Sequence, residues 1–322
     1  MADINHRTIA TNGINMHIAE AGEGPLVVLC HGFPESWYSW RHQIPVLADA
    51  GFHVIAPDQR GYGTTDRPEA IEAYSLLHLV GDIVGLVHAL GETQAVIIGH
   101  DWGSPVAWSA AQWRPDVFRA VASLSVPTRD RGPAPPMQLM DQVFGDRFFY
   151  QLYFQTPGVA EHELEHDVGE TVRKMLVGAS GAIERAAIAF DPTGSPPKTA
   201  YMLENMADPG DDLPDWLTAA DVAFFTDIFE QTGFRGGLNW YRNIDRNWEL
   251  SAAFQGKKIE QPALFMAGDR DVVPFNDDAE TAMRALVTDL RGAHVLPKVG
   301  HWTQQEAPAE VNEALSAFLK SL

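Results

Sequence analysis

Short apolar segments recur along the chain, and the segments between them carry apolar residues at helical spacing. A short, uninterrupted apolar run is typical of a strand that is buried on both faces of a parallel sheet. Such runs occur at residues 25–30, 53–56, 95–98, 120–125, 262–267 and 294–296. Residues 14–19 alternate loosely and predict an edge strand, and helical spacing predicts helices over 76–90, 105–113 and 308–319. Because strands alternate with helices, the pattern predicts an α/β fold with a doubly wound, mostly parallel sheet.

The composition and the hydrophobic pattern of the sequence change after Pro127. Residues 128–250 are rich in aromatic side chains and lack a clear apolar strand run. We interpret this segment as a helical cap, or lid, inserted into the core. The predicted domains are a first part of the core at 1–127, the cap at 128–250 and a second part of the core at 251–322.

Candidate catalytic side chains follow the predicted strands. His31, Asp101, Asp271 and His301 each stand at or shortly after the end of one, and in open α/β sheets sites form at the carboxyl ends of the strands. The most informative segment is Gly-His-Asp-Trp-Gly at 99–103, between a strand and a helix. It matches the G-x-S-x-G pattern of a nucleophile elbow, in which flanking glycines let the chain turn sharply and present the central side chain above the sheet.

Asp101 stands where such an elbow usually carries serine, and this changes the chemistry. A carboxylate that attacks a saturated carbon gives an alkyl ester, which water can cleave at the aspartate carbonyl. A serine would give an ether that water does not cleave. The segment therefore predicts displacement at an sp3 carbon followed by ester hydrolysis. On this segment alone, the alternative is a structural aspartate that caps the following helix.

Two later residues supply the partners that such a nucleophile needs. Asp101, Asp271 and His301 follow the chain order nucleophile, acid, base of the α/β-hydrolases. We expect His301 to be the general base that activates water, and Asp271 to hold its tautomer. Asp269 is the alternative candidate for the acid.

Ester hydrolysis also needs donors for a tetrahedral oxyanion. The backbone N–H of Trp102, directly after the nucleophile, is one expected donor, and the N–H of Phe33 in the loop 31–34 is the other. Pro34 predicts a cis bond in that loop, because cis peptides are largely confined to X-Pro.

The net charge of the chain argues against two classes of binding partner. The chain has 322 residues with 23 Lys and Arg against 43 Asp and Glu, a net charge of −20, which argues against nucleic acid or an anionic membrane as a partner. Cys30 is the only cysteine, which fits a reducing cytoplasm. We find no signal-peptide pattern, no apolar run long enough to span a bilayer and no metal-binding motif. The G-x-G at 61–63 reads as a tight turn rather than a nucleotide site.

With these motifs in view, the sequence resembles the soluble epoxide hydrolases of the α/β-hydrolase fold, from about residue 10 onward. The most specific segments are HGFPESWYSWRHQ at 31–43, DQRGYG at 58–63, GHDWG at 99–103, YQLYFQTPGVAE at 150–161, GFRGGLNWYRN at 233–243 and KVGHWTQ at 298–304. The resemblance implies conversion of epoxides to vicinal diols through an alkyl ester on Asp101, without a cofactor or metal. It further implies a bacterial-type enzyme that lacks the additional N-terminal phosphatase domain of the mammalian enzymes.

The resemblance also assigns residues of the cap. It implies that Tyr150 and Tyr241 hydrogen-bond the epoxide oxygen, with Tyr153 as a neighbour that is easily confused with Tyr150. The implied partner is a small apolar or aromatic epoxide, and a homodimer is left open. The substrate contacts expected on this basis are Phe33, Pro34, Trp102, Tyr150, Tyr241 and Trp302.

Two rival functions use the same fold. A haloalkane dehalogenase would also use an aspartate nucleophile with histidine and aspartate, but a halide leaves without a proton. The two cap tyrosines and Phe33, where dehalogenases usually have Asn or Glu, favour the epoxide. The other rival is a non-catalytic ligand receptor, which the intact triad argues against.

Overall fold

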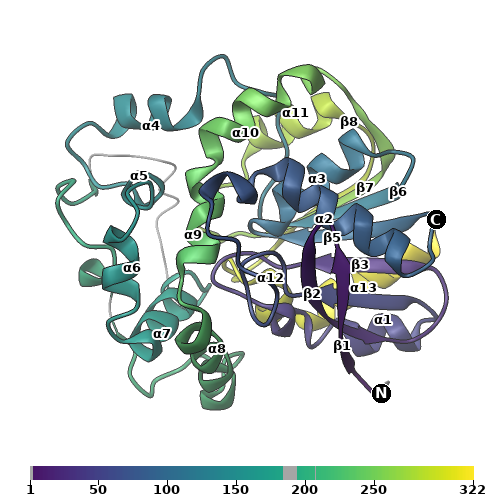
Figure 1. Cartoon of the computed structure of the whole chain (residues 1–322), viewed down its shortest axis with the longest axis horizontal. Helices are drawn as coiled ribbons and strands as arrows, with labels where there is room; N and C mark the ends of the chain where they lie inside the picture. The colour runs from purple at the N-terminus through teal and green to yellow at the C-terminus, as the bar shows by residue number, and fades with distance from the viewer. Residues whose placement is uncertain (1–2, 184–193, 207) are drawn as a thin grey trace.

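One mostly parallel sheet runs through the molecule (Figure 1). The computed structural model describes residues 3–183, 194–206 and 208–322. The sheet has eight strands in the order β1-β2-β4-β3-β5-β6-β7-β8. β1 pairs antiparallel with β2, β2 pairs antiparallel with β4, and all other neighbours are parallel. The strands are β1 Asn5–Thr11, β2 Ile14–Ala21, β3 Leu26–Cys30, β4 His53–Pro57, β5 Ala95–His100, β6 Phe118–Leu124, β7 Ile259–Gly268 and β8 Val287–Leu296.

The apolar runs mark the central strands correctly, and the corrections concern the two edges of the sheet. The edge expected at residues 14–19 is wrong, because β2 lies second in the sheet and β1 is the edge strand. β1 is exposed along most of its length, so it carries no apolar run. The strand expected at 294–296 begins earlier, at Val287, because this second edge strand is also only partly buried.

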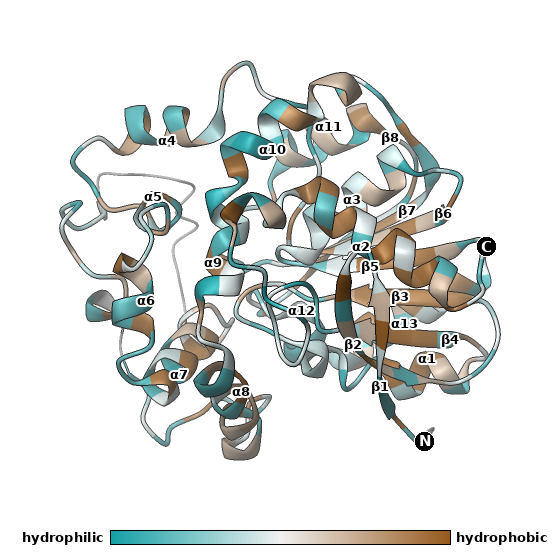
Figure 2. Ribbon diagram, in the orientation of Figure 1, coloured by the Kyte–Doolittle hydropathy of each residue, from teal (hydrophilic) through white to brown (hydrophobic). Residues whose placement is uncertain are grey.

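Helices cover both faces of the sheet. Side chains alternate across a strand, so Val96 and Ile98 of β5 face one way and Ile97 the other. The first face packs against α1 (Ile44–Asp49) and α13 (Pro308–Lys320), and the second against α2 (Leu76–Ala89) and α3 (Gly103–Trp113). This double burial explains the continuously hydrophobic central strands in Figure 2. The predicted helices at 76–90, 105–113 and 308–319 are therefore confirmed, with ends that differ by one or two residues.

A helical region is inserted between β6 and β7 and lies to one side of the sheet (Figure 1). The described residues of this insertion contain no strand, only an isolated bridge between Arg147 and Pro197. The helical insertion is thus confirmed, while its expected limits at 128 and 250 stay a prediction. Its helices are α4 Pro136–Phe144, α5 Tyr150–Tyr153, α6 Val159–Leu164, α7 Val168–Gly178, α8 Ala219–Thr232, α9 Arg235–Arg242 and α10 Ile244–Leu250.

The remaining helices belong to the core. They are α11 Asp277–Leu286 and α12 Thr303–Glu306, with short 3-10 turns at Trp37–Trp40, Ile71–Tyr74 and Ser251–Phe254, while the insertion holds a further 3-10 turn at Leu203–Asn205. In the part of the chain that the structure describes, no helix is long and apolar enough to cross a membrane. Likewise, the described histidines, cysteines and carboxylates form no cluster suited to a metal ion.

A buried ion pair supports the loop on which the cap helix α9 rests. The Arg60 guanidinium donates to both carboxylate oxygens of Asp82, at 2.7 and 2.6 Å, and both side chains are buried. The carbonyl of Arg60 in turn accepts from the indole of Trp240 in α9, at 3.1 Å. This pair therefore links helix α2, the loop after β4 and the helix that carries Tyr241.

We expect Asp82→Ala to destabilise the protein by about 3 to 5 kcal/mol, because it leaves the Arg60 charge buried and uncompensated. The matched control is Asp116→Ala, which breaks the exposed Arg114–Asp116 pair and should cost less than about 1 kcal/mol. Urea unfolding of both variants measures the difference. Equal effects of the two substitutions would contradict the role given to the Arg60–Asp82 pair.

Candidate active site

The nucleophile elbow forms where the sequence predicts it. Asp101 lies between β5 and α3 with a φ of 48°, in the left-handed region that non-glycine residues rarely adopt. The turn is tight because glycines flank it: a Cβ on Gly103 would collide with the carbonyl of Cys30, and one on Gly99 would collide with Gly103. A strained aspartate held by such close contacts is positioned for reaction rather than for helix capping, since its carboxylate contacts the N–H of Phe33 and the ring of His301, both outside α3.

The Asp101 carboxylate is held at both of its oxygens. The backbone N–H of Phe33 donates to Oδ1 at 2.7 Å, and Nε2 of His301 lies 3.3 Å from Oδ2. The Phe33–Pro34 bond is cis, as predicted. The N–H of Phe33, an expected oxyanion donor, therefore faces the Asp101 carboxylate, and its role in holding the oxyanion stays a prediction. The Trp102 amide remains a prediction for the second donor.

His301 is oriented by Asp271 and not by Asp269. Its Nδ1 lies 2.9 Å from Asp271 Oδ1, and the N–H of Val273 donates to the same oxygen at 2.8 Å. An ionised carboxylate only accepts, so Nδ1 carries the proton and Nε2 faces Asp101. Asp269 instead accepts from the backbone of Lys298 at 2.6 Å and shapes the loop before His301.

Two carboxylates set the charge of His301. Burial alone lowers its pKa, but the charge of Asp271 and the hydrogen bond with Asp101 raise that pKa well above its usual value. The resting site therefore holds a protonated imidazole between two negative charges. Loss of either charge returns the His301 pKa towards the range in which the ring acts as a base.

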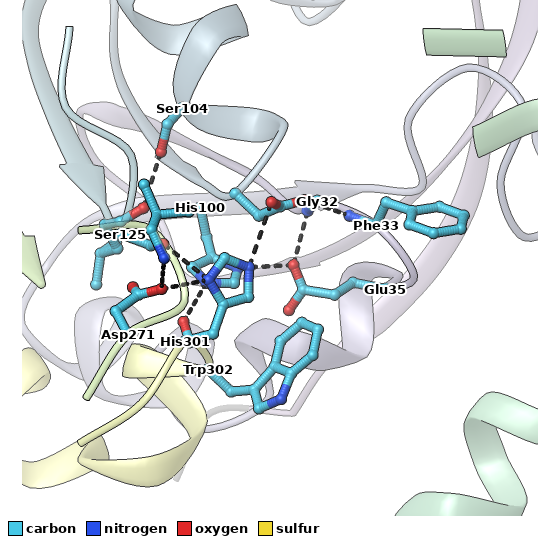
Figure 3. A network of polar contacts seen from close by, with 12 residues as sticks. Gly32, Phe33, Glu35, His100, Ser104, Ser125, Asp271, His301 and Trp302 are labelled. Carbon is cyan, nitrogen blue, oxygen red and sulfur yellow. Dashed lines mark hydrogen bonds and ion pairs between the residues drawn. The ribbon is translucent and has the colours of Figure 1, made fainter. Parts of the chain in front are cut away.

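A second buried pair, which the sequence did not reveal, lies beside His301 (Figure 3). His100 Nδ1 lies 2.7 Å from Glu35 Oε2, and its Nε2 lies 2.7 Å from the carbonyl of His301. Because that carbonyl can only accept, Nε2 must carry a proton. Burial raises the pKa of Glu35, but the charge and hydrogen bond of His100 outweigh it and lower that pKa to about 2. Glu35 also accepts from the N–H of Gly32 at 2.7 Å, so it joins the oxyanion loop to the elbow.

The predicted histidine at the end of β3 has a structural role. The N–H of Gln59 donates to His31 Nε2 at 3.0 Å, and His31 Nδ1 lies 2.9 Å from the carbonyl of Gly32. Both ring nitrogens are thus occupied in holding two loops together, and His31 does not line the cavity above Asp101.

The cap places two phenols opposite the nucleophile. Tyr150 of α5 and Tyr241 of α9 line the same cavity as Asp101, with their ring centroids 5.9 Å apart. Burial, reinforced by the charge of Asp101, raises the pKa of both hydroxyls, so both stay protonated at neutral pH. Tyr153 is separate, because its hydroxyl donates to Glu163 at 2.8 Å and the residue is absent from the cavity lining.

The cavity has a volume of about 490 Å³ and lies between the cap and the core. Of the expected substrate contacts, Trp102, Tyr150 and Tyr241 line it, whereas Phe33, Pro34 and Trp302 do not. The Phe33 ring lies edge-on to Tyr241, with centroids 5.5 Å apart, and the Trp302 indole donates to the carbonyl of Leu176 at 2.6 Å. The lining residues that sequence reasoning missed are Pro105, Val126, Pro127, Thr128, Arg129, Gln151, Ile244, Val273, Pro274, Asn276, Asp278, Ala279 and Ala282.

Known proteins share both the fold and the sequence. The α/β-hydrolase fold family matches residues 25–308, which defines the class of protein. Epoxide hydrolase A of Mycobacterium tuberculosis is 45% identical, over 98% of this chain and 97% of the relative. The epoxide hydrolase from an endophytic Streptomyces superimposes with a TM-score of 0.93 at 45% identity, over 98% of this chain and 95% of that chain. The crystal structure of epoxide hydrolase A from Mycobacterium thermoresistibile superimposes with a TM-score of 0.91 at 46% identity, over 99% of this chain and 98% of that chain. The chain therefore belongs to the epoxide hydrolases of the α/β-hydrolase fold.

We expect the His301 imidazole to titrate well above pH 6.5 in the resting enzyme and nearer to that value in Asp101→Asn, which lacks one of the two charges. Because the folded pKa is raised, protonation stabilises the folded state fully below about pH 6.5, and this contribution is lost as pH rises through the folded pKa. NMR titration of His301 measures both values. A wild-type ring that titrates at or below 6.5 would refute the charge arrangement.

Proposed function

We propose that this epoxide hydrolase works in two steps through a covalent ester on Asp101. Asp101 attacks an epoxide carbon while Tyr150 and Tyr241 donate to the ring oxygen. His301, oriented by Asp271, then activates the water that releases a vicinal diol. The observation that carries this proposal is the placement of one carboxylate between a histidine at 3.3 Å and a cavity lined by two phenols.

The first step needs a proton donor, because an opened epoxide leaves as an alkoxide. A phenol is a stronger acid than the alcohol that forms, so it can donate to the developing alkoxide and later recover its proton. The charge moves from Asp101 to the ring oxygen, on the side of the cavity where the two hydroxyls stand. Both tyrosines line the cavity together with Asp101, and the charge of Asp101 contributes to the raised pKa of their hydroxyls.

The second step needs a base, and alkylation of Asp101 creates it. The ester is neutral, so His301 loses one of the two charges that raise its pKa. As that pKa falls, His301 passes its Nε2 proton through water to the phenolate left by ring opening, and the neutral Nε2 then accepts a proton from the water that attacks the ester carbonyl. The oxyanion that forms is stabilised by the N–H of Phe33, which donates to Oδ1 at 2.7 Å in the resting state, together with the N–H of Trp102.

The lining of the cavity favours an apolar or aromatic epoxide. Apart from the reacting groups, much of the wall is aliphatic or prolyl, including Pro105, Val126, Ile244 and Val273. Such a wall gains free energy by removing apolar surface from water. The single cysteine, buried and unpaired, supports a site of action in a reducing cytoplasm.

A single turnover in water enriched in heavy oxygen tests the covalent step. With enzyme in excess over styrene oxide, we expect the first diol to be unlabelled and the label to enter the Asp101 carboxylate, because water attacks the ester carbonyl. Mass spectrometry of the diol and of the Asp101 peptide measures both. Label in the first diol would show direct attack by water. In parallel, halide release from a bromoalkane without diol formation from styrene oxide would favour the dehalogenase chemistry.

We expect Tyr150→Phe and Tyr241→Phe each to slow ester formation, and the double variant to abolish it, because a positioned general acid contributes about 10² to 10⁴ in rate. Stopped-flow measurement with styrene oxide separates ester formation from ester hydrolysis. Tyr153→Phe is the matched control, since its hydroxyl bonds Glu163 away from the cavity, and it should react at the wild-type rate. Ester formation by the double variant would refute the role of the phenols.

A further inference from the structure

A strained residue at the end of β6 lies against the catalytic base. Ser125 follows the last residue of β6 and has a φ of 74°, in the left-handed region. Among the described residues, the only other non-glycine positions with positive φ are Asn12, Asp101 and Lys298. A side chain in this region costs conformational energy, and such strain persists mainly where the surrounding structure enforces it at functional sites. Asp101, the nucleophile, is one case, and Ser125 calls for a similar explanation.

Hydrogen bonds from neighbouring elements hold the backbone around Ser125. Its own N–H donates to the carbonyl of Met266 in β7 at 2.8 Å. The Ser104 hydroxyl donates to the carbonyl of Leu124 at 2.9 Å, and the Ser123 hydroxyl donates to that of Val126 at 2.8 Å. The residues on both sides are therefore fixed, and the Ser125 side chain is fully buried.

This backbone aims the Ser125 hydroxyl at His301. Ser125 Oγ lies 2.9 Å from His301 Nδ1, the same distance that separates Nδ1 from Asp271 Oδ1 (Figure 3). Because Asp271 requires the proton on Nδ1, the Ser125 oxygen faces that N–H as a second acceptor. One N–H is thus shared between the ends of two neighbouring strands, β6 and β7.

The Asp271 oxygen that faces the His301 N–H is shared with a second donor. Asp271 Oδ1 already accepts from the N–H of Val273 at 2.8 Å. Its Oδ2 is buried and has no hydrogen-bond partner among the described residues. Ser125 Oγ adds a second acceptor opposite the same N–H, and a buried imidazolium is stabilised by each acceptor that its N–H groups meet.

We propose that Ser125 is a positioning residue for His301, which holds the Nδ1–H tautomer and stabilises the imidazolium that forms during ester hydrolysis. This inference rests on the proposed two-step function. Ser125 does not line the cavity and its hydroxyl meets His301, so we expect it to act through His301. Its effect falls on the second step, because ester formation uses Asp101 and the phenols and needs no proton transfer at His301.

The test uses two substitutions that both remove the hydroxyl but differ in their effect on the strained backbone. Ser125→Ala removes the hydroxyl and keeps the left-handed strain, whereas Ser125→Gly removes the hydroxyl and relieves the strain. With styrene oxide as the probe, we expect both variants to form the ester within twofold of the wild-type rate and to hydrolyse it about tenfold more slowly. Rapid quench with intact-mass detection of the ester measures the two rates. The glycine variant keeps the test decisive if the alanine variant folds poorly.

The pH profile separates positioning from simple packing. Loss of an acceptor for Nδ1–H lowers the pKa of His301 in the ester, so the acid limb of ester hydrolysis should move to lower pH in both variants. The control is Thr171→Val, which removes a buried hydroxyl hydrogen bond to the carbonyl of Leu164 within the cap. It should leave the limb in place. A limb that does not move in the Ser125 variants, or one that moves equally in Thr171→Val, would overturn the proposal.

Measurement of the ester in the wild-type enzyme separates failure of the two-step mechanism from failure of the role given to Ser125. If the wild-type enzyme converts styrene oxide without an ester on Asp101, the two-step mechanism itself fails. If the wild-type ester forms and both Ser125 variants hydrolyse it at the wild-type rate, only the role of Ser125 fails.

Discussion

The carboxylate of Glu35 is the contact on which the geometry of the site depends most. It is buried and accepts from the N–H of Gly32, from His100, and from the side-chain amides of Gln304 and Gln305, at 2.7 to 3.3 Å. These donors belong to the oxyanion loop, the elbow strand and the helix after the base. Burying a carboxylate is costly unless each oxygen is paired. This one therefore holds its partners in fixed positions, and with them the loops that carry Phe33, Asp101 and His301.

A fixed frame of this kind explains how strain can persist at the nucleophile. Asp101 sits in a left-handed conformation, and its carboxylate contacts Phe33 and His301 from opposite sides. Relaxation of the Asp101 backbone would break both contacts and would move the turn against Gly32, which has no room for even a Cβ beside Asp101. The strain is thus balanced by hydrogen bonds and close packing around it. The same reasoning applies at the end of β6, where neighbouring strands hold Ser125.

The sequence was most informative where one physical signal dominates. Continuous apolar runs marked the central strands because both of their faces are buried, and the glycine-flanked Asp101 marked the elbow because nothing larger fits there. The edge strands β1 and β8 were missed or shortened because they are largely exposed. Glu35 and Ser125 were not singled out because their roles depend on contacts across long sequence separations. The tyrosines came only from the resemblance, since their positions over Asp101 follow from how the cap folds back on the core.

One charge coordinates the protonation states of the whole site. The negative charge of Asp101 contributes to the raised pKa of His301, and it also raises the pKa of Tyr150 and Tyr241. The resting enzyme consequently holds an imidazole that cannot act as a base and phenols that can donate. In the proposed mechanism, alkylation of Asp101 passes its charge to the epoxide oxygen beside the phenols, and the pKa of His301 falls. The first step therefore produces the neutral His301 that the second step requires, and each step uses a different protonation state of this ring.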